Sequence, residues 1–296
     1  MNLKLPYYIL CGTRVLQTFV IFSVMLTMTT VEAAPKIQVH GHRGARAVRP
    51  ENTIPAFEYA IQVGVDVLEL DMAVTRDNVL VVSHDLEMNR KIHEGPAGET
   101  AIRKLTLEQI RQWDCGKLKN PEYPKQQPVP GTRMPTIDEV FALASKGSFE
   151  FNIETKIDAK RPELTPAPPE YARLVVEAIR RHKLEKRVMV QSFDFRTLHE
   201  VKKLAPEVRL SALYAGLPKS FVAISKEAGG AQIVSPHHRI TWKTYVEAAH
   251  KAGLQVVPWT ANKPGEWDSL IEAQVDAIIS DDPAELIQHL KKRGLR

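Results

Sequence analysis

The sequence has few cysteines, and it has no long apolar run after its first 26 residues. Of its two cysteines, Cys11 lies in the N-terminal segment and Cys115 is the only one beyond it. A single cysteine forms no internal disulfide, cysteine metal site or redox pair, so Cys115 is interpreted as a bystander. No later segment is apolar over the roughly 20 residues that a membrane span needs.

Two further signals are missing. The basic residues are scattered and form no stripe with interleaved aromatic residues, so nucleic acid binding is not expected. No glycine-rich dinucleotide loop follows the first apolar run. What remains is a chain of 296 residues with 44% hydrophobic and 25% charged residues, which is typical of a globular enzyme.

The first 33 residues differ from the rest. Lys4 and Arg14 are followed by the apolar run Val15–Leu26 and then by small residues up to Ala33. This pattern predicts a signal peptide that is cleaved after Ala33, leaving residues 34–296 in the periplasm or outside the cell without a stable membrane anchor. The alternative is an uncleaved anchor, although a run of about a dozen residues is short for a span of about 20. The sequence predicts no oligomeric state.

From residue 35 onward, short apolar runs alternate with segments of helical period, which favours parallel strands joined by helices. The predicted helices are Thr53–Val63, Thr106–Trp113, Ile137–Ser145, Pro169–His182, Phe195–Leu204, Trp242–Ala252 and Pro283–Lys292. The predicted strands are Ile37–His42, Val67–Met72, Val79–Ser83, Phe149–Thr155, Arg187–Gln191, Val208–Leu213, Gln232–Ser235, Leu254–Trp259 and Ala277–Ser280.

Two of these nine strands are too close for a parallel connection. Only Ala73–Asn78 separates Val67–Met72 from Val79–Ser83, whereas a parallel crossover needs about a dozen residues. The second strand should therefore fold back antiparallel, leaving eight parallel strands. We predict an α/β fold of the (β/α)8 TIM-barrel class with active residues at the C-terminal strand ends; a doubly wound open sheet is the alternative.

Residues 86–135 interrupt the alternation with about fifty residues rich in proline and glycine. An insertion of this length after the second strand's hairpin is interpreted as a lid or a substrate-binding segment, and decoration of the barrel rim is the alternative.

Carboxylates gather at the ends of two predicted strands. Glu69 and Asp71 share one face of their strand because side chains alternate, and Glu154 ends the next barrel strand. Like charges this close favour a bound cation, and oxygen ligands alone favour Ca²⁺ or Mg²⁺. Lys156 shares the face of Glu154, where it offers a positive charge to a phosphoryl oxygen or forms an ion pair with Glu154.

Two histidines are expected beside these carboxylates. His42 and Arg43 follow the first strand and pair a general acid or base with an anion-binding guanidinium. If the turn after the second strand centres on Asp77, residues whose numbers add up to about 154 face each other, so the hairpin carries His84 back to the level of the carboxylates. Phosphate bound to a metal between two imidazoles is suited to acid–base cleavage of a phosphodiester.

These residues resemble the glycerophosphodiester phosphodiesterase family over nearly the whole chain after the leader. The similar stretches are His42-Arg43-Gly44, Pro50-Glu51-Asn52-Thr53, Ala56-Phe57, Gly64, Glu69-Leu70-Asp71, Thr75, Asp77, Val81-Val82, His84-Asp85, Ile153-Glu154-x-Lys156, Gln191-Ser192-Phe193-Asp194, Trp259-Thr260-x-Asn262 and Ile279-Ser280-Asp281-Asp282-Pro283. His40 and Ser280 depart from the family pattern. We interpret His40 as barrel filling rather than as a third catalytic imidazole.

The resemblance implies a hydrolase that converts small-molecule glycerophosphodiesters, such as glycerophosphocholine and glycerophosphoethanolamine, to glycerol 3-phosphate and an alcohol. It places metal ligands on Glu69, Asp71 and Glu154, and acid–base roles on His42 and His84. Phosphate contacts fall on Arg43 and Lys156. By analogy His42 is assigned as the base and His84 as the acid, and the nucleophile is either water or the glycerol 2-hydroxyl.

Further substrate contacts are predicted with an alternative for each. Glu51 and Asn52 are expected to bind glycerol hydroxyls or the metal, unless Asn52 only caps the first helix. Trp259 and Phe193 are expected to stack on the substrate or to pack in the core. Two rival functions are a lysophospholipase D acting on lysophospholipids and a non-catalytic glycerophosphodiester-binding protein.

Overall fold

The sheet determines where the functional side chains lie. In this computed structural model, which describes residues 1–5, 7 and 36–296, nine strands form one sheet in the order β8-β7-β6-β5-β4-β2-β1-β9, with β3 paired to β2 alone. The strands are β1 (Gln38–Gly41), β2 (Val67–Val74), β3 (Leu80–Val82), β4 (Glu150–Thr155), β5 (Val188–Ser192), β6 (Arg209–Tyr214), β7 (Ile233–Pro236), β8 (Gln255–Val256) and β9 (Ala277–Ser280).

Backbone hydrogen bonds close this sheet between its two ends. The Asp276 N–H donates to the Val256 carbonyl at 3.1 Å, and the Ile279 N–H donates to the Pro258 carbonyl at 3.0 Å. All pairs along the path are parallel, so the predicted eight-stranded (β/α)8 barrel is confirmed. The predicted strand Leu254–Trp259 is too long, because Pro258 has no N–H to donate to the ladder.

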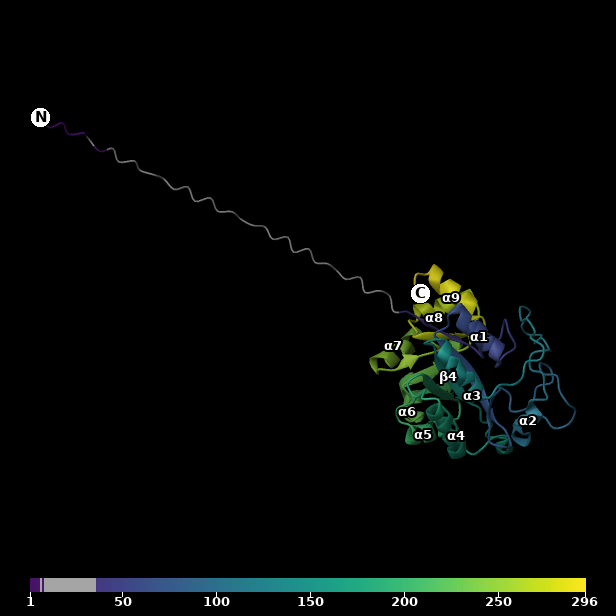
Figure 1. Ribbon diagram of the computed structural model, residues 1–296. Coiled ribbons are helices and arrows are strands. Elements are labelled where there is room, and N and C mark those ends of the chain that lie inside the picture. Colours follow the sequence, from purple (N-terminus) through teal and green to yellow (C-terminus); the bar gives the residue numbers. More distant parts are fainter. Residues whose placement is uncertain (6, 8–35) are drawn as a thin grey trace. The chain divides into compact units, whose positions relative to one another are not determined.

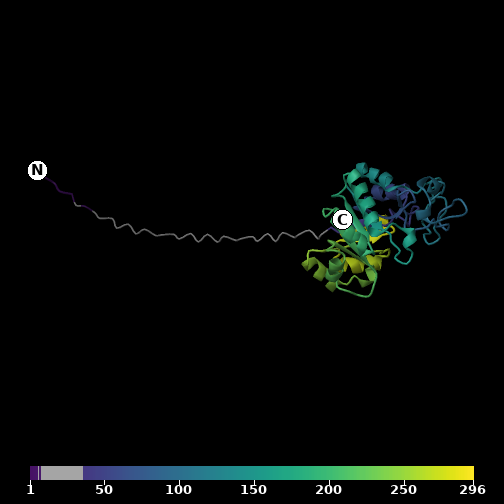
Figure 2. The same cartoon turned by 90° about the horizontal axis from the view of Figure 1, so that it is seen from below.

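Helices surround the barrel, and neighbours in sequence pack side by side, as α4 and α5 do (Figures 1 and 2). They are α1 (Ile54–Val63), α2 (Leu107–Ile110), α3 (Ile137–Phe141), α4 (Pro168–Arg181), α5 (Phe195–Leu204), α6 (Phe221–Glu227), α7 (Lys243–Lys251), α8 (Pro264–Glu272) and α9 (Pro283–Lys292). The sequence did not predict α6, which has only seven residues, or α8, whose start at Pro264-Gly265 has the composition of a turn.

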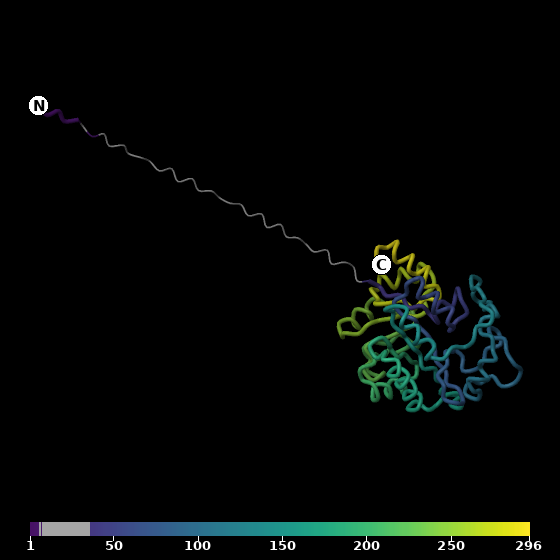
Figure 3. The backbone as a smooth tube through the Cα atoms, in the orientation of Figure 1, coloured from purple at the N-terminus to yellow at the C-terminus, as the bar shows by residue number. Residues whose placement is uncertain are grey.

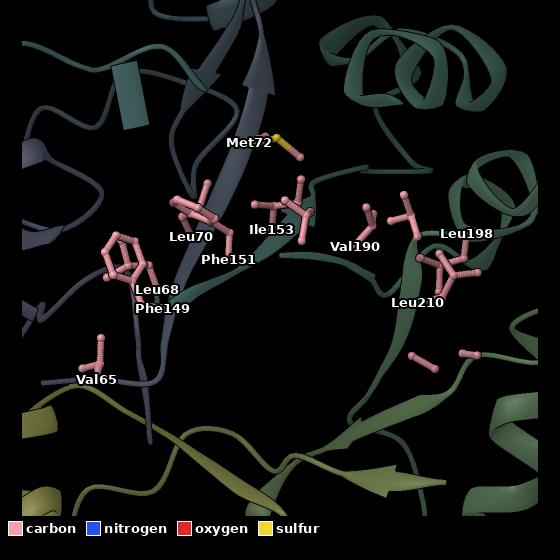
Figure 4. Close-up of a cluster of buried hydrophobic side chains, with 14 of the residues drawn as sticks. Val65, Leu68, Leu70, Met72, Phe149, Phe151, Ile153, Val190, Leu198 and Leu210 are labelled. Atoms are coloured by element: carbon pink, nitrogen blue, oxygen red, sulfur yellow. The ribbon is translucent and has the colours of Figure 1, made fainter. Parts of the chain in front are cut away.

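Alternation along each strand separates an outer core from the barrel interior. Outward residues of β2 (Leu68, Leu70 and Met72) pack with Phe151 and Ile153 of β4 beneath the helices (Figure 4). The inward residues at the base of the barrel form a smaller apolar cluster of Val67, Met189, Ile233, Val257, Ala277 and Ile279. Polar inward residues lie above that cluster, so one end of the barrel is available for chemistry.

The β2–β3 hairpin has the predicted register. Met72 faces Val82 and Val74 faces Leu80, so paired residue numbers add up to 154. The Ser83 N–H then donates to the Asp71 carbonyl at 3.0 Å, which brings the chain back beside the carboxylates. The prediction that the second strand folds back antiparallel is confirmed.

The insertion, residues 86–135, gathers at one edge of the barrel in both ribbon views, and its long loops around α2 can be followed in the tube (Figures 1, 2 and 3). It has an apolar cluster of its own, formed largely by its residues Met88, Ile102, Ile110, Trp113 and Met134 and packed against Ala73 and Val81 of the hairpin. Cys115 belongs to this cluster, and burial raises the pKa of its thiol to about 12, which suits the role of a bystander.

The predicted signal peptide, residues 1–33, falls mainly outside the described residues. Among residues 1–5, 7 and 36–296, no helix combines the length and apolar character that crossing a membrane requires.

Candidate active site

Three buried carboxylates meet at the C-terminal end of the barrel strands. One oxygen atom each of Glu69, Asp71 and Glu154 lies within 4.8 Å of the other two. The β2–β4 register places Asp71 beside Glu154, and strand alternation puts Glu69 on the same inward face as Asp71. The three residues that were predicted as metal ligands are therefore brought together.

Repulsion among these three buried carboxylates, the acid cluster, favours a positive charge beside them. Burial and the neighbouring Asp71 raise the pKa of Glu69 well above its ordinary value, and burial raises the pKa of Glu154 to about 7. Burial also opposes ionisation of Asp71, but Arg43 and Lys156 nevertheless hold its pKa well below the usual range. A divalent cation would relieve the repulsion among these oxygen donors, so the residues fit a site for a hard cation such as Ca²⁺ or Mg²⁺.

Hydrogen bonds fix the orientation of these carboxylates. Gln191 Nε2 donates to Glu69 Oε1 at 2.7 Å, and Gln191 Oε1 in turn accepts from Asn152 Nδ2 at 3.0 Å. Asn52 Nδ2 donates to Asp71 Oδ2 at 3.0 Å. Asn52 does not cap α1, because the Thr53 side chain accepts the N-terminal hydrogen bond from Ala56, so that alternative is wrong.

The turn after β1 brings its backbone unusually close to the neighbouring elements. Arg43 has φ of 49° and Gly44 has φ of 82°, and a Cβ atom on Gly44 would lie 2.7 Å from the backbone of Ala56. A side chain at position 44 would therefore be excluded both by conformation and by space. The same turn points the Arg43 N–H at Glu69 Oε2, 2.8 Å away. Strain of this kind is typical of functional sites.

Three cationic side chains border the acid cluster. Arg43 Nη1 lies 2.6 Å from Glu51 Oε1, and its Nε lies 3.3 Å from Asp71 Oδ2. Arg46, which the sequence did not single out, lies 2.9 Å from Glu51 Oε2. Lys156 Nζ lies 2.8 Å from Glu154, so the predicted ion pair is present. Glu51 is thus held by two guanidinium groups, which positions both arginines at the mouth of the barrel.

His42 is held by an aspartate from the last strand's end. Its Nδ1 lies 2.5 Å from Asp281 Oδ1, and its Nε2 faces Glu69 Oε2 at 3.9 Å. Asp281 also accepts from Asn262 Nδ2 at 2.7 Å and from the hydroxyl of Tyr123 at 3.2 Å. Although burial raises the pKa of Asp281, the facing His42 and Arg46 hold it at about 2. Asp281 is therefore a carboxylate, so His42 donates from Nδ1 and its Nε2 is free to accept a proton.

His84 lines the same cavity as the acid cluster and has an aspartate partner of its own. Its Nδ1 lies 2.9 Å from Asp85 Oδ1, and Asn89 donates to the other oxygen of Asp85 at 2.8 Å. The hydrogen bond from His84 lowers the pKa of Asp85 to about 2. The His84 ring therefore also donates from Nδ1, and it lines the cavity that contains His42 and the three carboxylates.

Aromatic side chains form another wall of this cavity, which has a volume of about 180 Å³. Trp259 and Phe193 meet edge to face with their ring centroids 5.4 Å apart, and the indole N–H of Trp259 donates to the Ser235 carbonyl at 2.9 Å. Phe193 is 46% exposed, so an apolar surface remains available beside the acid cluster.

Sequence reasoning assigned no role to Asp281, Asn262 or Tyr123. Asp281 lies directly after β9, which pairs with β1 in the sheet. The order of the strands therefore places a residue from the end of β9 beside His42. His40 lies inside the barrel, in register with Val67 and Ile279, and is fully buried. It does not line the catalytic cavity, as expected of barrel filling.

Residues 42–285 match the Glycerophosphoryl diester phosphodiesterase family. A glycerophosphodiester phosphodiesterase of Caldanaerobacter subterraneus subsp. tengcongensis is 35% identical over 261 residues, which cover 88% of this chain and 100% of that protein. The similarity therefore covers the whole length of that relative.

Solved structures share the fold. A protein of Silicibacter pomeroyi DSS-3 assigned as a glycerophosphoryl diester phosphodiesterase has a TM-score of 0.82 and 28% identity, covering 88% of this chain and 95% of its own. A phosphodiesterase of Oleispira antarctica, solved in complex with the product sn-glycerol-3-phosphate, has a TM-score of 0.73 and 24% identity, covering 86% of this chain and 97% of its own. At that identity the second likeness is one of fold alone.

Proposed function

The chain belongs to the glycerophosphoryl diester phosphodiesterase family, and we propose that it hydrolyses glycerophosphodiesters to glycerol 3-phosphate and an alcohol at the cavity between His42 and His84. It is accordingly a phosphodiesterase enzyme. The observation that carries the proposed mechanism is the pair of imidazoles that line one cavity with the acid cluster, each oriented by an ionised aspartate.

In this proposal Glu69, Asp71 and Glu154 hold one divalent cation, either Ca²⁺ or Mg²⁺. When bound, the cation supplies positive charge to the phosphate oxygens and orients the diester. Arg43 and Lys156 border the same space, so their charges meet the negative charge that builds up on the phosphate during cleavage.

The two histidines divide the proton transfers. Burial lowers the pKa of His42 although Asp281 acts in the opposite direction, and a neutral imidazole with a free Nε2 is suited to be the base. It takes a proton from water, which attacks phosphorus directly, or from the glycerol 2-hydroxyl, whose attack forms a cyclic phosphate that water then opens to glycerol 3-phosphate. His84, which is 36% exposed, is in contact with solvent protons and donates one to the departing alkoxide. The aromatic wall of Trp259 and Phe193 offers the glycerol carbons an apolar contact.

The proposal is tested with residues 34–296 expressed without the leader. Protein is incubated with glycerophosphocholine, glycerophosphoethanolamine or lysophosphatidylcholine, with and without a chelator, and glycerol 3-phosphate and free alcohol are measured. We expect glycerol 3-phosphate from a glycerophosphodiester, lost on chelation and restored by Ca²⁺ or Mg²⁺. Release of choline from lysophosphatidylcholine alone would favour a lysophospholipase D, and no product from any diester would contradict the proposal.

We also propose that residues 1–33 direct the enzyme to the periplasm or outside the cell, where it acts on diesters that reach that space. The test is the N-terminal residue of protein recovered from cell fractions. A mature chain that begins at Ala34 and is found outside the inner membrane supports the proposal, whereas an intact leader in the cytoplasm contradicts it.

A further inference from the structure

A second cavity adjoins the catalytic one. It has a volume of about 460 Å³, and it shares His84 and Lys156 with the catalytic cavity. Its remaining lining comes from two loops, one at the start of the insertion and one after β4. Those residues are Asp85, Leu86, Glu87, Asn89, Ile157, Asp158 and Arg161.

The catalytic cavity alone is small for a whole diester. Its volume of about 180 Å³ lies below the roughly 300–1,000 Å³ of typical ligand sites. A phosphodiester has an organic group on each side of its phosphate, so one group must extend beyond the acid cluster. The larger cavity begins at His84, and an acid that protonates the leaving oxygen has to lie between the phosphate and the leaving alcohol.

From this arrangement we propose, resting on the proposed function, that the second cavity binds the leaving alcohol and that it selects small alcohols carrying a primary ammonium group, of which ethanolamine is the simplest. Hydrolysis breaks the bond between phosphorus and the alcohol oxygen, His84 supplies the proton to that oxygen, and the alcohol leaves through the cavity into solvent.

The polar groups of the lining argue for this class of alcohol. Leu86 and Ile157 are its apolar residues, so a long acyl chain would meet little apolar surface. The lining contains no Phe, Tyr or Trp ring with which to enclose a trimethylammonium group. A primary ammonium group, in contrast, offers three hydrogen-bond donors to carboxylates.

The charge balance also favours a cation. Lys156 is paired with Glu154, and His84 with Asp85, so neither pair brings an unmatched positive charge to the cavity. Arg161 lies 2.7 Å from Glu87 of the insertion and 2.9 Å from Asp158 of the loop after β4. Two carboxylates facing one guanidinium leave one negative charge in excess at the rim, where an ammonium group would be attracted.

The decisive experiment compares two diesters of similar size. We measure kcat/KM for glycerophosphoethanolamine and for glycerophosphoglycerol, whose leaving alcohol carries no charge. The ratio of the first value to the second is taken at low ionic strength. Arg161→Gln frees both carboxylates and should raise the ratio about two- to fivefold, as expected for partly exposed charges. Glu87→Gln should lower it by about the same factor, and Glu87→Gln with Asp158→Asn should lower it further.

A matched control is available on α4. Arg173 also lies between two carboxylates, at 2.8 Å from Glu170 and 2.6 Å from Glu177, but it does not line the cavity. Arg173→Gln should leave the ratio unchanged. If the wild type turns over neither diester, the proposed function itself fails. Suppose instead that both diesters are turned over and that each of the three rim variants keeps the wild-type ratio of kcat/KM. The alcohol then does not bind in this cavity, and the inference is wrong.

Discussion

His42 and His84 face the same acid cluster, but the protein holds them in opposite ways. The His42 side chain is 12% exposed, and its partner Asp281 is 6% exposed. The corresponding fractions for His84 and Asp85 are 36% and 40%. Barrel strands and the insertion together enclose the first pair, whereas the second stands on a hairpin at the edge of two cavities.

The difference matches the two roles that we propose for these histidines. A base that works once per turnover benefits from a dry site in which its ring cannot rotate, because the free Nε2 must point at the nucleophile. An acid that loses its proton to a departing alcohol must be protonated again, and contact with solvent provides that proton. In the proposed mechanism the same His–Asp pairing would thus serve two purposes, distinguished by burial.

The largest expected effect comes from removing either ring. His42→Ala and His84→Ala should each lower kcat by about 10³-fold or more, within the range for general acid–base groups. The roles separate with a p-nitrophenyl ester of glycerol 3-phosphate, whose leaving group needs no proton. With that substrate His84→Ala should recover much of its activity and His42→Ala should not. Recovery in His42→Ala instead would reverse the assignment.

Circular dichroism and thermal melting check that both alanine variants remain folded. His289→Ala is a matched control, since His289 pairs with Asp268 between α8 and α9 at 2.6 Å and lies outside both cavities. Its kcat should equal that of the wild type within twofold.

A smaller and unequal effect is expected from the two aspartates. Asp281→Asn should lower kcat by about 10²-fold, because an amide in a buried network can present its NH₂ to His42 and favour the wrong tautomer. Asp85→Asn should cost less than about tenfold, since water can replace the exposed carboxylate as a partner of His84. The same assay with glycerophosphoethanolamine measures both variants. Equal losses would mean that burial does not distinguish the pairs.

The contribution of the insertion to the buried pair can be tested at Tyr123. Tyr123→Phe removes one hydrogen bond of 3.2 Å to Asp281 and should lower kcat about three- to tenfold with KM unchanged. Tyr59→Phe is the control, because the Tyr59 ring packs under Arg49 and does not contact Asp281. In the Asp281→Asn background the loss caused by Tyr123→Phe should disappear. A loss that persists there would show a role apart from Asp281.

The residues around the two histidines differ in whether the sequence alone could predict their roles. The acid cluster and the return of His84 depend on alternation along β2 and on one short turn, which are local properties of the chain. These could be predicted. Asp281 and Tyr123 could not be assigned roles in the same way, because their contacts depend on barrel closure and on the path of a fifty-residue insertion. The contacts join residues 239 and 158 positions apart.

Some predicted ends of strands and helices were wrong for local reasons. Pro258 shortens β8, and α3 gives way after Phe141 to a 3-10 helix that continues to Lys146. Neither change moves a residue of the acid cluster, because those residues lie on β2 and β4, where the ladder is continuous over six residue pairs. The predicted function thus depended on residues of the continuous β2–β4 ladder.

A third histidine, His40 on β1, provides the smallest effect and a limit to the comparison. His40 is fully buried, and neither ring nitrogen has a hydrogen-bond partner among the described residues. Burial lowers its pKa from 6.5 to about 3; Asp66 acts to raise it and Arg209 to lower it further. An imidazole without an aspartate partner should remain neutral and take no part in proton transfer. We therefore expect His40→Leu to change kcat at pH 7.5 by less than twofold.

The same residue should nevertheless govern part of the acid sensitivity of the fold. Below pH 6.5 the unfolded chain binds a proton at His40 that the folded protein rejects, so stability is fully present above that pH and falls toward pH 3. Between pH 7.5 and pH 5 this amounts to about 2 kcal/mol. Urea unfolding at pH 7.5 and pH 5 measures the loss of unfolding free energy on acidification. The loss should be about 2 kcal/mol greater for the wild type than for His40→Leu. His40→Gln replaces the leucine variant if that variant does not fold. Equal losses would mean that His40 is protonated inside the barrel, and its distinction from the two paired histidines would then rest on position alone.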